Sequence, residues 1–225
     1  MFVPDHYRNP HAAHALRWLA RYPFGTLVTT DAGGHIHATS LPFIAEPAGD
    51  GDTATSTTVL ISHMARRNPH GQALRDGDPA LVVVNGPSAY ISPRWYDSAQ
   101  NVPTWDYVGL QFRGRLARID DRAGLIDLMH RSIAAFEHGA ADAGATEAGL
   151  RPARPWRLDD APPAHVERLI QGVIGFRIVV ERIDCMEKLS QNKPDDRPLI
   201  QKRLCATATP GSMAPAVAAL MDAVI

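Results

Sequence analysis

The sequence predicts an α+β fold that is mainly β: an antiparallel sheet that closes or nearly closes on itself, with peripheral helices. Three observations lead to this class. β-Rich runs flank a turn signal at residues 31–34, apolar and alternating runs recur between residues 57 and 119, and helical spacing of apolar residues appears between them and near both ends. The 225 residues suit one domain, and 45% apolar with 21% charged residues is an ordinary globular composition.

The N-terminal third predicts a helix, a hairpin, a strand and a second helix. Asn9-Pro10 supplies a cap and a first-turn proline for a helix over 10–22. The turn Asp31-Ala32-Gly33-Gly34 joins two β-rich runs into a hairpin. The elements predicted here are strands 24–30 and 35–44, a mobile connection 46–56, a third strand 57–62, and a helix 65–75 ended by Asp76-Gly77-Asp78.

The remaining residues predict the rest of the sheet and its helices. Asp121 can cap a helix that runs to about residue 137, followed by a loop or disordered insertion at 138–155. The strands predicted here are 80–84 paired with 89–92 across 85–88, the long run 108–119, and 173–180. Further helices are predicted at 163–170, from Pro194 to Arg197 onward, and after residue 207, the last packed on the body or on a partner subunit.

Composition also bears on function. The net charge of −1 provides no general basic field for nucleic acid. We expect a cytoplasmic protein, because there is no leader pattern and no run of 18 apolar residues. Cys185 and Cys205 lack a CxxC motif, so both are expected to be buried. The pairs His35/His37 and His11/His14 have no partners at metal-ligand spacing, so we expect solvent-facing side chains and no metal site.

The segment 62–69 is the most informative one for function. A strand would deliver His63, Arg66, Arg67 and Asn68 to the start of a helix, where unpaired N–H groups and arginine forks favour an anion such as a cofactor phosphate. Two solvated arginines on an exposed turn explain the same residues equally simply.

Three other segments have both a functional and a structural interpretation. The segment Thr39-Ser40-Leu41-Pro42 is predicted to be an edge strand, or a strand whose hydroxyls and free backbone groups bind the polar rim of a planar heterocycle. Trp105 and Tyr107 share a strand face for core packing or ligand stacking. The polar run from Lys188 to Lys193 is an exposed helix end or a lid. No nucleophile elbow, phosphate loop or GxGxxG is present.

Taken in order, these segments resemble the PaiB-like family of FMN-binding negative transcriptional regulators, which have the FMN-binding split barrel. The matching motifs cover residues 1 to about 204. They are Met1-Phe2-Val3-Pro4 with Tyr7, Phe24-Gly25-Thr26-Leu27, Ala38-Thr39-Ser40-Leu41-Pro42-Phe43, His63-Met64-Ala65-Arg66 with Asn68-Pro69, Tyr90-Ile91-Ser92-Pro93 with Trp95-Tyr96, Val102-Pro103-Thr104-Trp105 with Tyr107, and Lys188-Leu189-Ser190-Gln191-Asn192-Lys193.

The resemblance implies a homodimer with two FMN sites at its interface and a split-barrel domain over 1–205, with 206–225 as its C-terminal tail or helix. It places the phosphate at Arg66 and Arg67, with Ser62, His63 and Asn68 adding hydrogen bonds, and the isoalloxazine along Thr39, Ser40 and Leu41. Trp105, Tyr107 and Lys188, Gln191 and Lys193 would close the pocket. The sequence departs from the family pattern at Asp106, where Asn is usual, at Gln111, where His is common, and at Arg67, where a smaller residue is common.

Three functions stay open on the sequence. The first is an FMN-binding regulator that acts as a homodimer. Its regulatory role and any contact with DNA rest on the resemblance alone, because no helix-turn-helix with a basic recognition helix is present and the residues do not favour direct DNA reading. The second is an FMN-dependent oxidoreductase or flavin reductase for a small substrate, in which the cofactor carries the chemistry and no protein acid or base is required. The third is a flavin or haem storage or sensing module.

Overall fold

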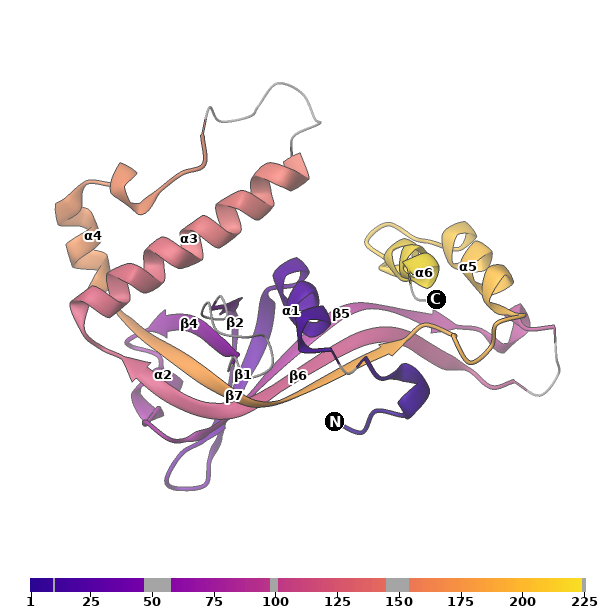
Figure 1. Ribbon diagram of the computed structural model, residues 1–225, viewed down its shortest axis with the longest axis horizontal. Helices are drawn as coiled ribbons and strands as arrows, with labels where there is room; N and C mark the ends of the chain where they lie inside the picture. Colours follow the sequence, from indigo (N-terminus) through magenta and orange to yellow (C-terminus); the bar gives the residue numbers. More distant parts are fainter. Residues whose placement is uncertain (10, 47–57, 98–100, 145–153, 224–225) are drawn as a thin grey trace. The chain divides into compact units, whose positions relative to one another are not determined.

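A computed structural model describes residues 1–9, 11–46, 58–97, 101–144 and 154–223, which form an α+β fold dominated by one antiparallel sheet (Figure 1). The helices are α1 (Ala12–Arg21), α2 (Pro69–Ala73), α3 (Arg122–Gly144), α4 (Pro163–Ile170), α5 (Arg197–Ala206) and α6 (Ala214–Ala223). The strands are β1 (Phe24–Thr30), β2 (Ile36–Pro42), β3 (Ile44–Ala45), β4 (Val59–Ala65), β5 (Pro79–Ile91), β6 (Thr104–Ile119) and β7 (Val173–Lys188). The predicted fold class is confirmed.

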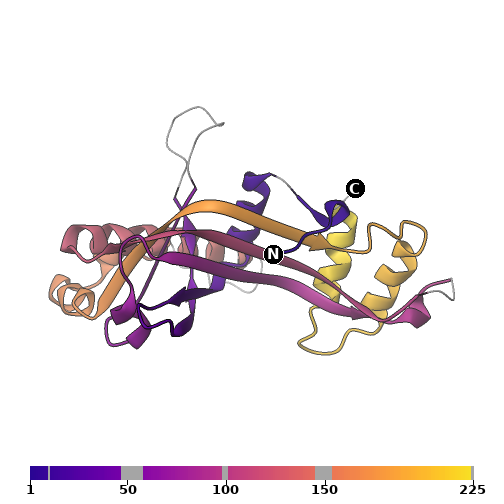
Figure 2. The same ribbon diagram turned by 90° about the horizontal axis from the view of Figure 1, so that it is seen from below.

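The strand order in the sheet is β2-β1-β5-β6-β7-β4-β3, so β2 and β3 are its terminal strands. β1 and β2 form the predicted hairpin, with Thr29 opposite His37 and Leu27 opposite Thr39. The Asp31 carboxylate accepts hydrogen bonds from the Gly33 and His35 backbone N–H groups and so closes the turn. The long strands β5, β6 and β7 lie side by side (Figure 2).

The chain forms two compact units. Unit 1 comprises residues 1–22, 83–112 and 182–225, and unit 2 comprises residues 23–82 and 113–181. β5, β6 and β7 each contribute residues to both units. The proposed boundary between a domain over 1–205 and a tail over 206–225 stays a prediction.

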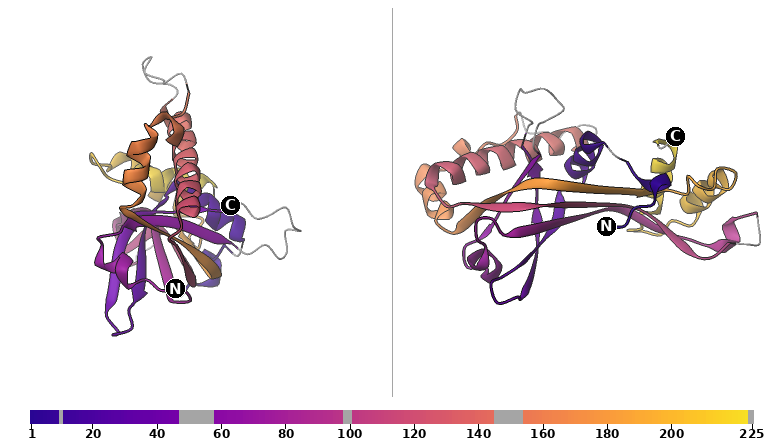
Figure 3. Two further views of the ribbon diagram at one scale, coloured as in Figure 1. Left: turned by 90° about the vertical axis from the view of Figure 1, so that its left-hand side faces the viewer. Right: turned by 60° about the horizontal axis from the view of Figure 1, so that its bottom comes forward.

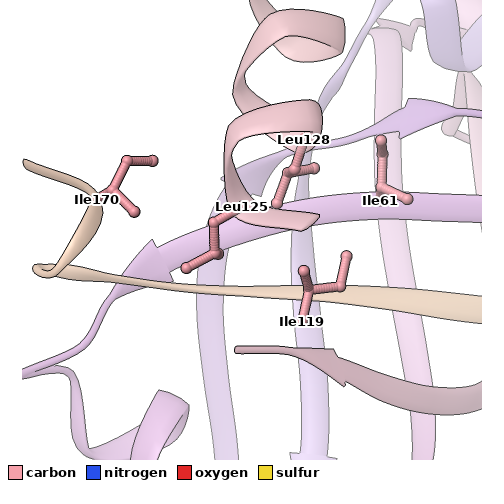
Figure 4. Close-up of a cluster of buried hydrophobic side chains, with 5 residues drawn as sticks. All are labelled: Ile61, Ile119, Leu125, Leu128 and Ile170. Carbon is pink, nitrogen blue, oxygen red and sulfur yellow. The ribbon is translucent and has the colours of Figure 1, made fainter. Parts of the chain in front are cut away.

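One buried apolar cluster of unit 2 lies between its strands and α3. Leu125 and Leu128 of α3 pack with Ile61, Ile119 and Ile170, all nearly inaccessible to solvent (Figure 4). Removing this apolar surface from water is the main source of stability here. α3 and α4 lie beside each other over one face of the sheet (Figure 3).

In unit 1, a buried carboxylate and an apolar cluster attach the N-terminal segment to β7. Val3 and Tyr7 pack with Met186 of β7. Glu187, 4% exposed, accepts a hydrogen bond from Trp18 Nε1 at 2.6 Å and lies 2.6 Å from His14 Nε2. A buried carboxylate needs such partners, because an uncompensated charge in the interior is costly.

The structure corrects the prediction of two strands at 80–84 and 89–92, because β5 runs without a break through Asn85-Gly86-Pro87-Ser88. Gly86 is required at a close approach, since a Cβ there would lie 2.9 Å from Val108 Cβ. β1 has seven residues and β5 thirteen, so part of one edge of β5 extends beyond β1, which relaxes the usual restriction on proline in a strand.

Four other element boundaries were also predicted wrongly. β4 extends to Ala65, and α2 begins only at Pro69 rather than at residue 65. α3 continues to Gly144 through part of the predicted insertion, because its alanine-rich sequence favours helix. β7 continues to Lys188, eight residues past the predicted end. The helices predicted at 163–170, with a start within 194–197, and after residue 207 are confirmed as α4, α5 and α6. Residues 47–56 of the predicted connection 46–56 and residues 145–153 of the predicted insertion 138–155 lie outside the described residues.

Candidate functional site

In unit 2, one face of the β1–β2 hairpin carries a polar cluster that is covered by His70 of α2. Thr29 and His37 are opposite each other across the strands, and Thr39 follows His37 by two residues on the same face. His70 is 3% exposed; its Nδ1 lies 2.8 Å from Thr39 Oγ1 and its Nε2 lies 2.9 Å from Thr29 Oγ1. The sequence reasoning missed His70, although it directly follows the Asn68-Pro69 motif.

His70 is neutral at physiological pH. Burial and the neighbouring His37, whose ring stacks on it at a centroid distance of 5.3 Å, lower its pKa to about 4. His37 in turn lies 3.1 Å from Asp31 Oδ2. Hydrogen bonds from His37, His35 and Gly33 hold the pKa of Asp31 well below its usual range, so this carboxyl is ionised.

The three predicted flavin-ring residues of β2 do not share a face. Thr39 is half-buried and Leu41 is buried on the His70 side, whereas Ser40 is exposed on the other side with its Oγ 3.4 Å from Thr26 Oγ1. Side chains alternate along a strand, so a planar ligand on one face would contact Thr39 and Leu41 but not the Ser40 side chain.

Ser62 and His63 lie in β4, next to the end of β2. The buried Ser62 hydroxyl donates to the Pro42 carbonyl oxygen at 2.6 Å, which joins β4 to the end of the terminal strand β2. His63 is half-buried, and burial lowers its pKa, so the imidazole is neutral. Within the described residues the His63 ring makes no hydrogen bond. Ser62 therefore has a structural partner, while His63 remains available to a ligand.

Arg66, Arg67 and Asn68 form the turn between β4 and α2 rather than the first helical turn. Arg66 Nε and Nη2 donate to the carbonyl oxygens of Gln171 and Val173 at 2.9 and 2.8 Å, and its Nη1 lies 3.9 Å from Asp120. Asn68 is the N-cap of α2: its Oδ1 accepts from the backbone N–H of His70 at 3.0 Å. The sequence analysis expected the N–H groups at the start of this helix to be free for an anion, but the cap occupies one of them, that of His70.

Arg67 differs from Arg66 in that its side chain is exposed. In the part of the chain that the structure describes, its guanidinium makes no hydrogen bond or ion pair. The Arg66 side chain thus stabilises the turn through its hydrogen bonds, whereas the neighbouring Arg67 guanidinium is exposed to solvent. The sequence-based interpretation of both arginines as anion ligands stays a prediction.

In unit 1, Trp105 and Tyr107 lie on one face of β6, as predicted. Trp105 is 55% exposed with its ring 6.1 Å from that of Tyr90, and the half-buried Tyr107 hydroxyl donates to Met186 Sδ at 3.2 Å. Asp106, on the opposite face, is fully buried, and its Oδ2 accepts from Ser190 Oγ at 2.6 Å. Desolvation raises the Asp106 pKa to about 6, while Ser190, Lys188 and Arg197 oppose the rise.

Residues 188–193 form a turn held by hydrogen bonds. Gln191 Oε1 accepts from the Leu189 N–H at 2.7 Å, and its amide donates to the Glu187 carbonyl oxygen. Lys188 Nζ donates to Thr104 Oγ1, and Lys193 Nζ donates to Asn101 Oδ1 and lies 5.1 Å from the Tyr96 ring centroid. All three predicted site residues of this turn therefore have partners within unit 1.

The cysteines and histidines correct other predictions. Cys185 is buried as predicted, and burial raises its pKa to about 12. Cys205 is exposed, contrary to the prediction, because α5 buries Ile200 and Leu204 instead. His37 and His14 are half-buried rather than solvent-facing, because each packs against a carboxylate. The partner of His37 is Asp31, six residues away across the hairpin turn, and the partner of His14 is Glu187, 173 residues away.

No group of three or more metal-ligating side chains occurs in the described ranges. None of the described helices is both long and apolar enough to cross a membrane.

Comparison with known proteins identifies the family. Residues 1–182 match the model of the family described as "Putative FMN-binding domain". The chain belongs to this FMN-binding, PaiB-like family. It is 30% identical over 195 residues to "Protease synthase and sporulation protein PAI 2" of Bacillus subtilis, covering 86% of this chain and 83% of that one. It is also 27% identical over 179 residues to an uncharacterized protein of Emericella nidulans, AN0679, covering 69% of each chain.

Solved structures share the fold of this family member. The FAD and heme binding protein from Mycobacterium smegmatis is similar with a TM-score of 0.53 at 17% identity, over 90% of this chain and 81% of that one. The conserved hypothetical protein Rv2991 from Mycobacterium tuberculosis is similar with a TM-score of 0.52 at 14% identity, over 84% of this chain and 91% of that one.

Proposed function

We propose that this protein binds FMN and acts as a homodimeric regulator of the PaiB type. The observation that carries the proposal is the family match over residues 1–182, which includes all the predicted cofactor residues except Lys188, Gln191 and Lys193. The likeness to the B. subtilis protein extends over most of both chains, which supports a related role.

We assign the FMN phosphate to the turn between β4 and α2. Arg67 supplies an exposed guanidinium. The Arg66 side chain is already held by hydrogen bonds to two carbonyl oxygens, and we propose that the N–H groups not used in these bonds donate to the phosphate. An arginine held in this way loses little conformational freedom when it binds an anion. The neutral His63 ring and the Ser62 and Asn68 side chains complete the polar surroundings.

We assign the flavin ring to the Thr39 side of β2. β2 is a terminal strand, so its outer edge can offer backbone groups to the polar rim of a heterocycle. Leu41 supplies apolar contact on the Thr39 side, and Ser40 can contribute through its backbone. We also propose flavin contacts from the other subunit of the homodimer, supplied by its residues Trp105, Tyr107, Lys188, Gln191 and Lys193.

Titration with FMN, followed by quenching of flavin fluorescence, tests the binding proposal. Arg67→Ala should weaken binding by about 1.5–3 kcal/mol, the value of a charge-assisted hydrogen bond, without lowering stability. Arg66→Ala should weaken binding and also destabilise the turn. Arg168→Ala, on an exposed position of α4, is the matched control and should bind as wild type does. Wild-type protein that fails to bind FMN would refute the proposal.

A second set of measurements separates a regulator from an FMN-dependent oxidoreductase or flavin reductase. Sedimentation equilibrium should report a dimer. Retention of DNA by the FMN-loaded dimer, measured at a stated ionic strength, would support the regulatory role. Rapid anaerobic bleaching of the flavin by NADH or NADPH, with no DNA retention, would instead establish the enzymatic alternative.

A further inference from the structure

His70 is held in place before any ligand is considered. Its backbone N–H donates to the Asn68 side chain, and Pro69 precedes it at the first position of α2. The next residue, Gly71, is closely packed, since a Cβ there would lie 3.0 Å from Met64 Sδ. The backbone on both sides of His70 is thus constrained, and the imidazole is directed into the interior of unit 2.

Both ring nitrogens of His70 are engaged, one on each strand of the hairpin. Nε2 meets Thr29 Oγ1 and Nδ1 meets Thr39 Oγ1, at 2.9 and 2.8 Å. Because its pKa is lowered to about 4, the ring carries one N–H and one lone pair at neutral pH. One threonine hydroxyl must therefore accept and the other donate, so the tautomer sets the direction of both hydrogen bonds.

The two threonines differ in their access to a ligand. Thr29 is 5% exposed and lies inside unit 2, whereas Thr39 is half-buried on the terminal strand β2. A hydroxyl has one donor and two acceptor positions, and His70 occupies one of those on Thr39. The hydrogen bond to His70 orients the Thr39 hydroxyl, so its two other hydrogen-bonding positions have set directions. These positions can bind a molecule that lies along β2.

We propose that His70 is a positioning residue for the flavin: by holding the Thr39 hydroxyl, it sets the hydrogen bond that Thr39 forms with the polar edge of the isoalloxazine, formed by its N3–H and carbonyl groups. This inference rests on the proposed FMN binding and on Thr39 as a ring contact. His70 is too buried to touch the cofactor itself, so its effect must pass through Thr39.

A double-mutant cycle between His70 and Thr39 tests the coupling. His70→Ala and Thr39→Val should each weaken FMN binding by about threefold to tenfold, the loss of one neutral hydrogen bond. The double variant should be no weaker than Thr39→Val alone. The reduction potential of the bound flavin should change in parallel, with the same shift in all three variants.

Two conservative variants separate positioning from packing. The side-chain amide of Asn can reach the place of Nδ1, beside Thr39, and that of Gln the place of Nε2, beside Thr29. His70→Asn should therefore restore wild-type affinity and potential, whereas His70→Gln should restore stability in urea but not the flavin properties. Additive effects of His70→Ala and Thr39→Val, or equal rescue by both conservative variants, would overturn the inference while leaving FMN binding intact. Wild-type protein that does not bind FMN would overturn the proposed function and this inference with it.

Discussion

Replacement of the buried Asp106 by Asn should change the pH dependence of stability. Asp106 is 0% exposed, its Oδ1 has no hydrogen-bond partner within the described residues, and its pKa is raised from 3.8 to about 6. A carboxyl with a raised pKa favours the folded state while it is protonated. Its contribution is complete below the unfolded value near 3.8 and is lost as the pH rises through about 6.

The rise of the Asp106 pKa from 3.8 to about 6 corresponds to about 3 kcal/mol of folding stability in total, of which about 2 kcal/mol is lost between about pH 4.5 and pH 7.5. Asp106→Asn removes this titration but keeps an acceptor oxygen for Ser190. The free energy of unfolding of the variant, relative to wild type, should therefore rise by about 2 kcal/mol across that interval. Tyr7 and Tyr96, whose pKa values the Asp106 charge helps to raise above 10.0, stay protonated across this interval and do not contribute to the difference.

Urea unfolding, followed by tryptophan fluorescence at several pH values and constant ionic strength, measures this difference. Asp195→Asn is the matched control, because Asp195 is exposed and precedes α5 in the same unit. The difference between Asp195→Asn and wild type provides the baseline for replacing an aspartate in this unit. A difference for Asp106→Asn that does not change with pH relative to this baseline would refute the reasoning, because it would show that the folded protein accommodates the charge of Asp106 without cost.

The other predictions concern packing and thiol chemistry. Gly114→Ala should destabilise by about 3 kcal/mol or more in urea unfolding, because the new Cβ would lie 2.0 Å from a backbone oxygen of β7. Gly109→Ala in the same strand, with its nearest contact at 3.5 Å, should cost less than about 1 kcal/mol, and equal losses would contradict the packing argument. Leu128→Ala should cost about 2–5 kcal/mol by the same assay, and a loss below about 1 kcal/mol would show that α3 does not close this core. A thiol reagent at neutral pH should label the exposed Cys205 at once and Cys185 only after denaturation, whereas prompt double labelling would count against the burial of Cys185.

Local sequence patterns predicted the structure correctly where all the interactions of an element lie within one segment of the chain. The Asp31-Ala32-Gly33-Gly34 turn closes its hairpin with hydrogen bonds inside the turn itself, and Gly34 has a positive φ of 81° that glycine adopts freely. Helix α4 begins at Pro163 and ends before Gly172, as its own residues predict. The same reasoning failed at Asn85-Gly86-Pro87-Ser88, because turn-forming residues can remain in a strand when a neighbouring strand approaches closely.

The sequence by itself determined the mainly antiparallel α+β fold, the family and the segments from which a flavin site is proposed, because these follow from periodicity, turn chemistry and ordered motifs within short stretches of chain. Only the tertiary structure decided which side chains are already engaged. His70 meets Thr39 from 31 residues away, and Ser190 meets Asp106 from 84 residues away. Arg66 is bound to carbonyl oxygens more than a hundred residues along the chain, while its neighbour Arg67 is exposed. Such long-range pairs depend on how strands and helices pack, and packing leaves no periodic signal at either partner.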